Sequence, residues 1–332
     1  MPHNILVISE KQGATKLQSL LDAINEGIAT GSLKPGDTLP SVNELSRMSG
    51  FSRDTIVKAY NILKQQSVIE STPAKGYYVS GSSFRVFMLL DDFSAFKEQL
   101  YKAFRENLPQ EYSVDLLFHH YNPAVFEQLV RNAIGRYSMY VIMNLSNTKL
   151  HPVLSKIDPK RLLILDMGSE HDPKINYLLQ NFDVSVSNCL EKGADLLKKY
   201  RELIFMYSRH KTPHPPDTEK AVREFCHIHE LEFRVMSEFD PEMMKPGQVY
   251  MPFTDNDLVQ VLKGCRSQCL SLGSEVGIIA YNDTPMKEIA GNGITVISVD
   301  FHEMGTKAAG FVKNKTRIQE YLSTRLIIRE SL

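Results

Sequence analysis

Hydrophobic residues recur with helical spacing in the first eighty residues of the chain. One apolar stripe consists of Leu17, Leu20, Leu21, Ile24 and Ile28. A second stripe, within residues 51–66, consists of Ile56, Ala59, Tyr60 and Leu63, which stand at i, i+3, i+4 and i+7. Each stripe is the apolar face of an amphipathic helix, so the pattern predicts a helix over each segment.

A shorter helix is predicted between these two. Ser41 and Glu44 have the S-x-x-E spacing of a capping box, which marks its start. Gly50 offers the left-handed turn that commonly ends a helix, and Ser52 can cap the helix that follows. The residues expected to face inward are Val42, Leu45 and Met48. Two short helices joined by a turn that contains glycine predict a helix-turn-helix.

The segment "SVIESTPAKGYYVSG" follows the helix-turn-helix. It contains two short β-type runs around the turn residues 73–76, so it predicts a β-hairpin with Lys75 at a basic tip. A helix, a helix-turn-helix and a hairpin in this order together predict a winged helix.

The pattern changes near Ser80. From there on, continuous apolar runs alternate with helical stretches, and the runs occupy residues 86–91, 113–119, 139–145, 161–166, 202–208, 231–236, 247–253, 275–283 and 294–300. Strands of this kind, alternating with helices, indicate parallel sheets that are covered on both faces. Nine strands are many for one sheet, so the pattern favours two sheets in two lobes.

The predicted fold class is therefore α/β, with an N-terminal winged helix-turn-helix and a two-lobed domain that contains two parallel sheets. We expect the winged helix in residues 1–80, a short linker in residues 81–84 and the two-lobed domain in residues 85–332. The length of 332 residues allows two or three globular units at roughly 100–200 residues each.

Charge restricts where a nucleic acid could bind. The formal net charge of the whole chain is −1, so a DNA site has to be local. Residues 47–64 carry four basic residues against one acid, Asp54. The positive charge therefore lies on the predicted helix-turn-helix, which supports DNA as its partner.

Other features indicate a cytoplasmic protein without a membrane span. The four cysteines form no C-x-x-C pair, no run of about 18 apolar residues occurs, and the N-terminus lacks the basic start of a secretory signal. The segment "CHIH" at residues 226–229 has no second ligand pair at a zinc-finger spacing, so we expect no metal site. No cofactor is expected either.

The start of the third predicted helix is suited to a DNA major groove. Ser52, Arg53 and Thr55 stand at its N-terminus, and Lys58 follows one turn later. Hydroxyl groups and the helix dipole hold phosphates, while an arginine can bind a guanine edge. The alternative for each residue alone is a solvated helix face, but the winged-helix order around them favours DNA contact.

Polar residues at the ends of the apolar runs are candidates for a small-molecule site. In parallel sheets, ligands bind at the carboxyl ends of the strands. The residues found there are Asp91, Asp92, Phe93, Ser146, Asn147, Asp166, Arg209, Thr254, Asp255, Asn282 and Asp283. Carboxylates, amides and an aromatic ring are suited to sugar hydroxyls, although each residue could instead be a turn or cap residue. Asp92 and Asp166 are the strongest candidates, whereas Asp283 could cap the next helix.

The stretch "LKPGDTLPSVNELSRMSGFSRDTIVKAYNILKQQSVIESTPAKGYYV" resembles the DNA-binding domain of the GntR family of bacterial transcription factors. The resemblance covers roughly residues 15–79. It implies that Ser41, Ser52, Arg53, Thr55 and Lys58 contact DNA, and that Lys75 and Gly76 form a wing tip in the minor groove. Asn43 departs from the pattern, because many members of the family have arginine there.

The stretch "GIIAYNDTPMKEIAGNGITVISVDFHEMGTKAAGFV" resembles the late part of the LacI/GalR effector domain, which has the periplasmic-sugar-binding-protein fold. "TDNDLVQVLKGC" and "RLIIRES" resemble two further segments of that domain. The resemblance implies sugar contacts at Asp166, Thr254 and Asn282. The family's arginine at the start of the following helix has no match near Glu219, so Arg209 is a substitute candidate.

Together these features predict a sugar-responsive transcriptional regulator. We expect a homodimer on a double-stranded, pseudo-palindromic operator, with a monosaccharide or a derivative as effector, and targets among carbohydrate-utilisation genes. One alternative is a regulator whose second domain binds no ligand and only dimerises. The other is an enzyme fused to a winged helix, but no phosphate-binding glycine motif and no G-x-S-x-G motif occurs.

Overall fold

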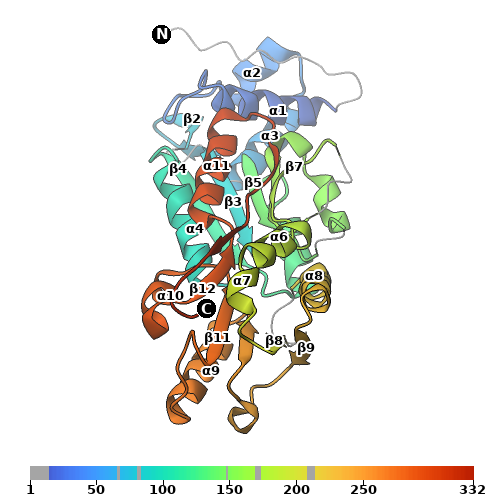
Figure 1. Cartoon of the computed structure of the whole chain (residues 1–332). Helices are drawn as coiled ribbons and strands as arrows, with labels where there is room; N and C mark the ends of the chain where they lie inside the picture. Colours follow the sequence, from blue (N-terminus) through green and yellow to red (C-terminus); the bar gives the residue numbers. More distant parts are fainter. Residues whose placement is uncertain (1–14, 66–67, 81–83, 147–148, 169–172, 208–213) are drawn as a thin grey trace.

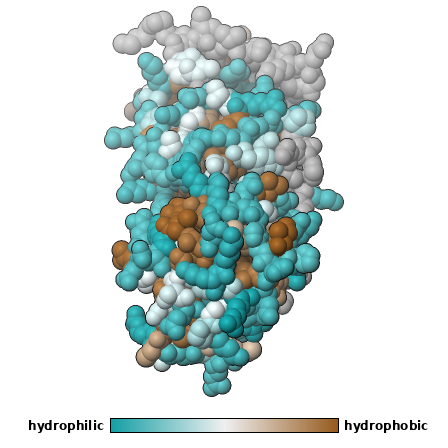
Figure 2. All heavy atoms as spheres, in the orientation of Figure 1, coloured by the Kyte–Doolittle hydropathy of each residue, from teal (hydrophilic) through white to brown (hydrophobic). Residues whose placement is uncertain are grey.

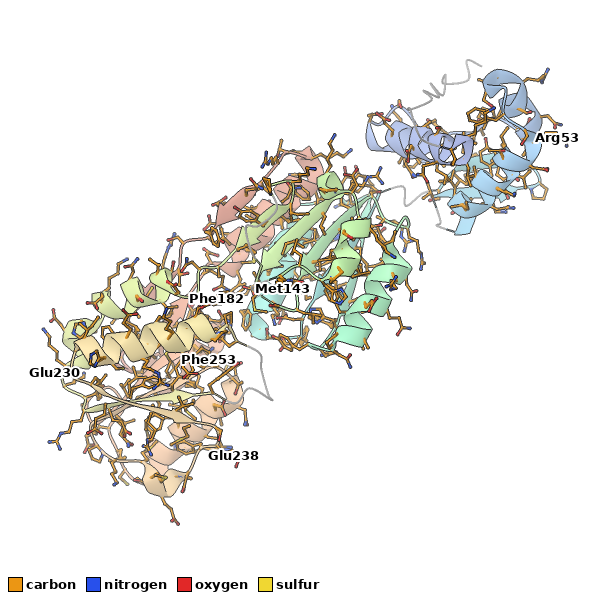
Figure 3. All side chains as sticks on the ribbon, turned by 90° about the vertical axis from the view of Figure 1, so that its right-hand side faces the viewer. Arg53, Met143, Phe182, Glu230, Glu238 and Phe253 are labelled. Carbon is orange, nitrogen blue, oxygen red and sulfur yellow. The ribbon has the colours of Figure 1, made fainter. Side chains whose placement is uncertain are left out.

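The computed structural model describes residues 15–65, 68–80, 84–146, 149–168, 173–207 and 214–332. Figure 1 shows an elongated molecule with the winged helix at one end, followed by two α/β lobes, and Figure 3 shows the same order from the side. The predicted fold class is confirmed: the two larger sheets are parallel apart from one edge strand.

The N-terminal part is a winged helix. Its elements are α1 (Lys16–Ala29), α2 (Val42–Ser49), α3 (Arg53–Gln65), β1 (Ile69–Thr72) and β2 (Gly76–Val79). Both branches of the predicted capping box of Ser41 and Glu44 are present, and Gly50 ends α2 at a φ of 71°. The Tyr60 hydroxyl donates a 2.7 Å hydrogen bond to the carbonyl oxygen of Pro40, which holds α3 against the start of α2.

One inward-facing residue was wrongly predicted in this domain. Leu45 is buried and Val42 packs against the core, but the Met48 side chain is 54% exposed. The helix α2 has only 8 residues, and its last turn extends past the core that α1 and α3 supply. The spacing of three residues was therefore too weak a signal to predict burial at the end of α2.

The first lobe contains a six-stranded sheet in the order β13-β7-β6-β5-β3-β4. Its elements are β3 (Phe84–Leu90), α4 (Ala95–Glu106), β4 (Tyr112–Phe118), α5 (Pro123–Ala133), β5 (Met139–Met143), the 3₁₀ helices Pro152–Lys156 and Pro159–Arg161, β6 (Leu162–Asp166), β7 (Asn176–Leu179), α11 (Phe301–Asn314) and β13 (Gln319–Tyr321). Alternate residues of β3 point to opposite faces: Val86 and Met88 pack with α4 and α11, while Phe87 packs with α5. Both faces are thus covered, which explains why the strands read as continuous apolar runs.

The second lobe contains a six-stranded sheet in the order β14-β12-β11-β10-β8-β9. Its elements are α6 (Val184–Lys192), α7 (Ala194–Leu197), β8 (Glu202–Met206), α8 (Pro216–Ile228), β9 (Glu232–Met236), the 3₁₀ helix Pro241–Met243, β10 (Gln248–Pro252), α9 (Asp255–Ser267), β11 (Val276–Tyr281), α10 (Pro285–Ile289), the 3₁₀ helix Ala290–Asn292, β12 (Thr295–Ser298) and β14 (Arg325–Ile327). The strand order is the same as in the first lobe, so the two lobes are topological repeats.

The chain crosses between the lobes three times in the described residues: after β7, after β12 and after β13. The second crossing brings α11 to the first lobe, where it packs along α4, and the third leads from β13 to β14 in the second lobe. The fit is close, since a Cβ at Gly305 of α11 would collide with the carbonyl oxygen of Leu100. Short crossings of this kind let the lobes move relative to each other about a few residues.

All nine predicted apolar runs form strands, and they divide between two sheets as expected. The strands β7 and β13 were not predicted. They have four and three residues, and each sits near a sheet edge, so neither has a run long enough to stand out.

Candidate functional site

A cavity of about 160 Å³ lies where the two lobes meet. The first lobe and its crossing contribute Asp91, Asp92, Ser94, Phe96, Lys97, Tyr121, Asp166, Met167 and Gln180 to its lining. The second lobe and its side of the crossing contribute Phe182, His214, Phe253, Thr254, Asp255, Tyr281, Asn282 and Lys287. Figure 3 shows Phe182 and Phe253 at the boundary of the lobes. The volume is below the roughly 300–1,000 Å³ of pockets for drug-sized ligands, so the site suits a smaller molecule.

Strand ends position most of these groups. Asp91 directly follows β3, Asp166 ends β6 and Tyr281 ends β11, while Thr254 caps α9 just after β10. Since the strands are parallel, their carboxyl ends meet at one edge of each sheet, and these two edges face each other across the cavity.

The first lobe presents a buried charge cluster. The Nζ of Lys97 forms ion pairs with the carboxylates of Asp91 and Asp92, and the side chains of Lys97 and Asp91 are only 3% and 2% exposed. The Tyr121 hydroxyl donates a 2.8 Å hydrogen bond to Oδ2 of Asp91. Burial acts to lower the pKa of Lys97, but the two carboxylates outweigh it and raise that pKa above its usual value. The Lys97 ammonium group is therefore held in its charged form.

Asp166 lies beside this cluster in a different environment. Its backbone has a left-handed φ of 67°, and its Oδ1 accepts a hydrogen bond from the side-chain amide of Gln180. Burial, together with the negative charge of Asp91, raises the pKa of Asp166 to about 6. The carboxyl group therefore titrates close to neutral pH.

The second lobe presents an aromatic wall. The Tyr281 ring lies nearly parallel to the rings of Phe182 and Phe253, with centroid distances of 6.4 and 5.5 Å. The His214 ring meets Tyr281 at 4.7 Å and Phe253 at 4.5 Å, and burial lowers the pKa of His214 to about 3. The imidazole is thus neutral. A wall of this kind can pack against the apolar face of a sugar ring.

Lys287 braces the polar end of the second lobe. Its Nζ donates hydrogen bonds of 3.0 and 2.8 Å to the carbonyl oxygens of Tyr281 and Asn282 and lies 3.3 Å from Oδ1 of Asp255. Burial lowers the pKa of Lys287 below its usual value. The ammonium group thus fixes the loop after β11, where Asn282 has a left-handed φ of 59°.

The structure brings six of the eleven predicted effector residues to the cavity: Asp91, Asp92, Asp166, Thr254, Asp255 and Asn282. Phe93 is 70% exposed and contacts Phe118 edge to face instead. Ser146 is not among the lining residues, and Asp283 forms an ion pair with Arg329. Asn147 and Arg209 lie outside the described residues.

Sequence reasoning missed the remaining lining residues, above all Lys97, Tyr121, Gln180, Phe182 and His214. A signal existed for Phe253 and Tyr281, because each aromatic residue stands at or just past the end of an apolar run. For Lys97 no such signal existed: a single lysine in a helix ordinarily reads as part of a solvated face.

The predicted DNA-contact residues lie on the surface of the winged helix. Exposed positions are Ser41, Asn43, Ser52, Arg53, Lys58, Lys75 and Gly76, while Thr55 is half-buried. Figure 3 shows Arg53 at the far end of the molecule, directed away from the lobes. At the wing tip, the Nζ of Lys75 lies 4.3 Å from the centre of the Tyr78 ring, and Gly76 has a φ of 73°. The helix start and the wing thus both present basic groups.

Ser52 has a structural task in addition to its predicted one. Its Oγ accepts a 3.2 Å hydrogen bond from the backbone N–H of Thr55 and lies 2.8 Å from the Thr55 hydroxyl oxygen. It therefore caps α3, as predicted, and orders the turn that carries Arg53.

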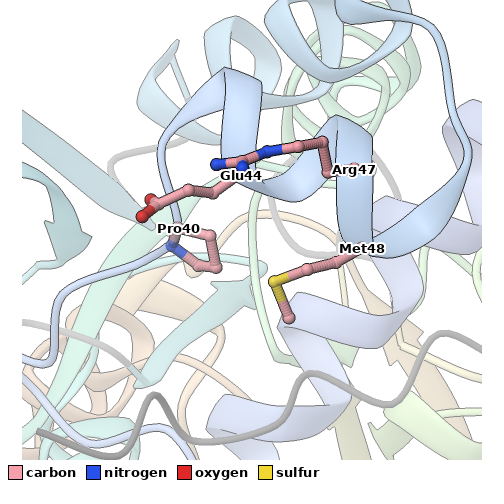
Figure 4. Close-up of a pocket in the computed structure, with 4 residues that line it drawn as sticks. All are labelled: Pro40, Glu44, Arg47 and Met48. Carbon is pink, nitrogen blue, oxygen red and sulfur yellow. The ribbon is translucent and has the colours of Figure 1, made fainter.

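A second cavity, of about 270 Å³, lies beside α2 and is remote from the cleft between the lobes. Its lining residues are Pro40, Glu44, Arg47 and Met48, and Figure 4 shows it in close-up. The exposed Met48 side chain borders this cavity. Its charged lining residues are Glu44 and Arg47, both on α2, whereas the cleft is lined by polar groups from both lobes.

Two family models match the chain. Residues 17–79 match the model of bacterial regulatory proteins of the gntR family, and residues 196–332 match the periplasmic-binding-protein-like domain. The fold and these matches define the class of protein: a GntR-type helix-turn-helix domain joined to a periplasmic-binding-protein-like domain. Both predicted resemblances are confirmed.

Curated relatives match the N-terminal part. The repressor MngR of the mannosyl-D-glycerate transport/metabolism system of Escherichia coli is 36% identical over 85 residues, which are 25% of this chain and 34% of the relative. The uncharacterized regulator YdcR of E. coli is 38% identical over 71 residues, or 21% and 15% of the two chains. The chain thus spans about a third or less of these relatives.

Solved structures match the two-lobed part. The trehalose repressor of E. coli aligns with a TM-score of 0.61 at 12% identity, over 74% of this chain and 99% of the repressor. A LacI-family transcriptional regulator of Lactobacillus casei with bound sucrose aligns with a TM-score of 0.61 at 14% identity, over 75% and 99%. At these identities the likeness shows a shared fold.

None of the helices in the described part of the chain has both the length and the apolarity needed to cross a bilayer. The described residues likewise contain no group of three or more histidine, cysteine, aspartate or glutamate side chains placed to hold a metal ion.

Proposed function

We propose that the chain is a DNA-binding transcriptional regulator whose DNA affinity depends on a small-molecule effector. The effector is a monosaccharide or a derivative, it binds between the lobes, and the regulated genes serve carbohydrate use. The observation that carries this proposal is a cavity lined by both lobes in a chain that also carries a GntR-type helix-turn-helix domain.

The cavity is equipped for a sugar on both sides. Carboxylates of Asp91, Asp92 and Asp166 on one side accept hydrogen bonds from hydroxyl groups, and the rings of Tyr281 and Phe253 on the other side pack against C–H bonds. A ligand that contacts both lobes favours the arrangement in which they are close. It can change DNA binding only by as much as its affinities for the two arrangements differ.

We propose that the winged helix docks α3 in a major groove, with Arg53 as a base-edge contact and Lys58 as a phosphate contact. Ser41 and Thr55 add hydroxyl donors, Asn43 is a candidate contact, and Lys75 and Gly76 enter the minor groove. A homodimer would place two such units on a pseudo-palindromic site, spaced by its own two-fold axis.

A thermal-shift screen tests the effector claim. The intact protein is heated with pentoses, hexoses, deoxyhexoses and their phosphates at millimolar concentration. A ligand that binds only the folded protein raises its melting temperature by mass action, and Asp166→Ala should abolish that rise. If no compound shifts the melting temperature, the result favours the alternative that the two-lobed domain binds no ligand and only dimerises.

A further inference from the structure

The cavity contains polar atoms that have no partner in the described structure. Oε1 of Gln180, Oδ1 of Asn282 and the hydroxyl groups of Tyr281 and Ser94 are all buried without a hydrogen bond. Gln180 and Tyr281 are only 5% and 2% exposed, and all four residues line the cavity. Most buried side-chain polar atoms in native proteins have a hydrogen-bond partner, so these four point to a ligand that supplies one.

Two of the four atoms, the amide oxygens of Gln180 and Asn282, are pure acceptors. Gln180 cannot turn its amide group around without loss, because its Nε2 already donates to Asp166. The ligand must therefore supply a hydrogen-bond donor to Oε1 of Gln180. The Asn282 amide can turn to present its oxygen or its nitrogen, and the hydroxyl groups of Tyr281 and Ser94 can either donate or accept.

The two ammonium groups in the described lining are already bound by protein groups. Lys97 is held by Asp91 and Asp92, and Lys287 is held by two backbone carbonyls and Asp255. Four carboxylates, those of Asp91, Asp92, Asp166 and Asp255, thus share two ammonium groups around one small cavity. The described lining therefore carries more negative than positive groups.

We propose that the cleft selects a neutral or amine-bearing polyol and rejects its phosphorylated and carboxylated derivatives. This inference rests on the proposed function and narrows its ligand class. Hydroxyl and ammonium groups donate to the unpartnered Oε1 of Gln180, whereas phosphate and carboxylate groups are acceptors with negative charge. An anionic group in the cavity would face like charges at short range, which disfavours binding strongly.

The aromatic wall orients such a ligand. Tyr281, Phe182 and Phe253 form one side, and Asp91, Asp166 and Gln180 form the other. The ligand therefore turns a C–H face to the second lobe and an edge rich in donors to the first lobe.

Matched sugar series test the inference by isothermal titration calorimetry of the full chain. Each parent sugar is compared with its amino sugar, its uronate and its 6-phosphate, for example D-glucose, D-glucosamine, D-glucuronate and D-glucose 6-phosphate, and the D-galactose series likewise. We expect binding by the neutral or amino form of one series and at least about a hundredfold weaker binding by both anionic forms.

Variants separate charge from a general loss of binding. Asp92→Asn removes one negative charge from a side chain that is 34% exposed, and it should narrow the ratio of neutral to anionic affinity by at least about threefold. The control Glu224→Gln changes an exposed carboxylate on α8 and should leave the ratio unchanged. Tyr281→Phe should weaken binding of the neutral form about tenfold while the melting temperature of the free protein holds, since that hydroxyl has no protein partner.

The outcomes are distinguishable. Tighter binding of a phosphate or a uronate than of its parent overturns the inference and leaves the proposed sugar-responsive function standing. An Asp92→Asn protein with an unchanged affinity ratio also overturns it. The absence of binding in all forms of every series contradicts both the inference and the proposed function.

Discussion

Asp166 and Asn282 occupy equivalent positions in the two lobes. Asp166 ends β6 and Asn282 directly follows β11. The two sheets have the same strand order, and β6 and β11 are each third from the edge formed by β13 or β14. Both residues have a left-handed backbone, with φ of 67° and 59°, and both side chains line the cavity. Left-handed backbone at non-glycine residues is uncommon and concentrates at functional sites, so the pair supports a functional role for the cleft.

The charge cluster of the first lobe should be essential for its stability. Lys97→Met leaves the buried carboxylate of Asp91 and the partly exposed one of Asp92 without their cation, which should lower the free energy of unfolding by about 3–5 kcal/mol. Urea unfolding measures this change. Lys102→Met, an exposed lysine on the same helix, serves as the control and should change little. Equal effects of the two variants would show that the cluster is not the cause.

Asp166 should make stability depend on pH. Its folded pKa of about 6 lies above the ordinary value of 3.8, so the wild type loses stability as the pH rises through 6. Asp166→Asn has no such loss. The variant should therefore exceed the wild type by up to about 3 kcal/mol at pH 8, and the difference should vanish below about pH 4. Chemical unfolding at both pH values tests this, and a variant that is less stable at pH 8 contradicts it.

Asp283 and Arg329 should contribute to folding and leave ligand affinity unaffected. The guanidinium group of Arg329 donates hydrogen bonds of 2.9 and 2.7 Å to the two carboxylate oxygens of Asp283. Asp283→Ala should lower the free energy of unfolding by about 1–3 kcal/mol. Ligand affinity should stay within twofold in calorimetry, because Asp283 does not line the cavity. A tenfold loss of ligand affinity would instead show that Asp283 takes part in ligand binding.

Substitutions of Ser52 and Arg53 should have different effects, the first on folding and the second on DNA binding. Ser52→Ala removes the cap of α3 and should lower the free energy of unfolding of the winged helix by about 1 kcal/mol. Arg53→Ala should leave that free energy unchanged, since the side chain is exposed, but should weaken operator binding about tenfold or more. Fluorescence anisotropy with a labelled operator measures the binding, and the exposed Lys220→Ala on α8 is the matched control.

Much of this fold could be predicted because its signals are local. Capping at Ser41, helical stripes and continuous apolar runs each depend on neighbours in the chain, and all of them correspond to elements of the structure. Asp91 and Asp166 could be placed in the cleft because parallel strands bring their carboxyl ends together.

The rest of the site depends on contacts between distant segments. Gln180 and Phe182 lie in a crossing between the lobes, where no periodic pattern exists, and Lys97 becomes buried only because β3 ends against α4. The hydrophobic residues in Figure 2 likewise gather near the middle of a mostly hydrophilic face, a distribution that no single segment encodes.

The most direct test of the central claim is DNA affinity measured with and without ligand. A DNA site is first selected by the protein from a randomised pool, and anisotropy titrations then give its affinity for the free protein and for protein saturated with the sugar from the screen. A change of about fivefold or more, abolished by Asp166→Ala, is the predicted result. Identical affinities at saturating ligand would show that the cleft does not control DNA binding.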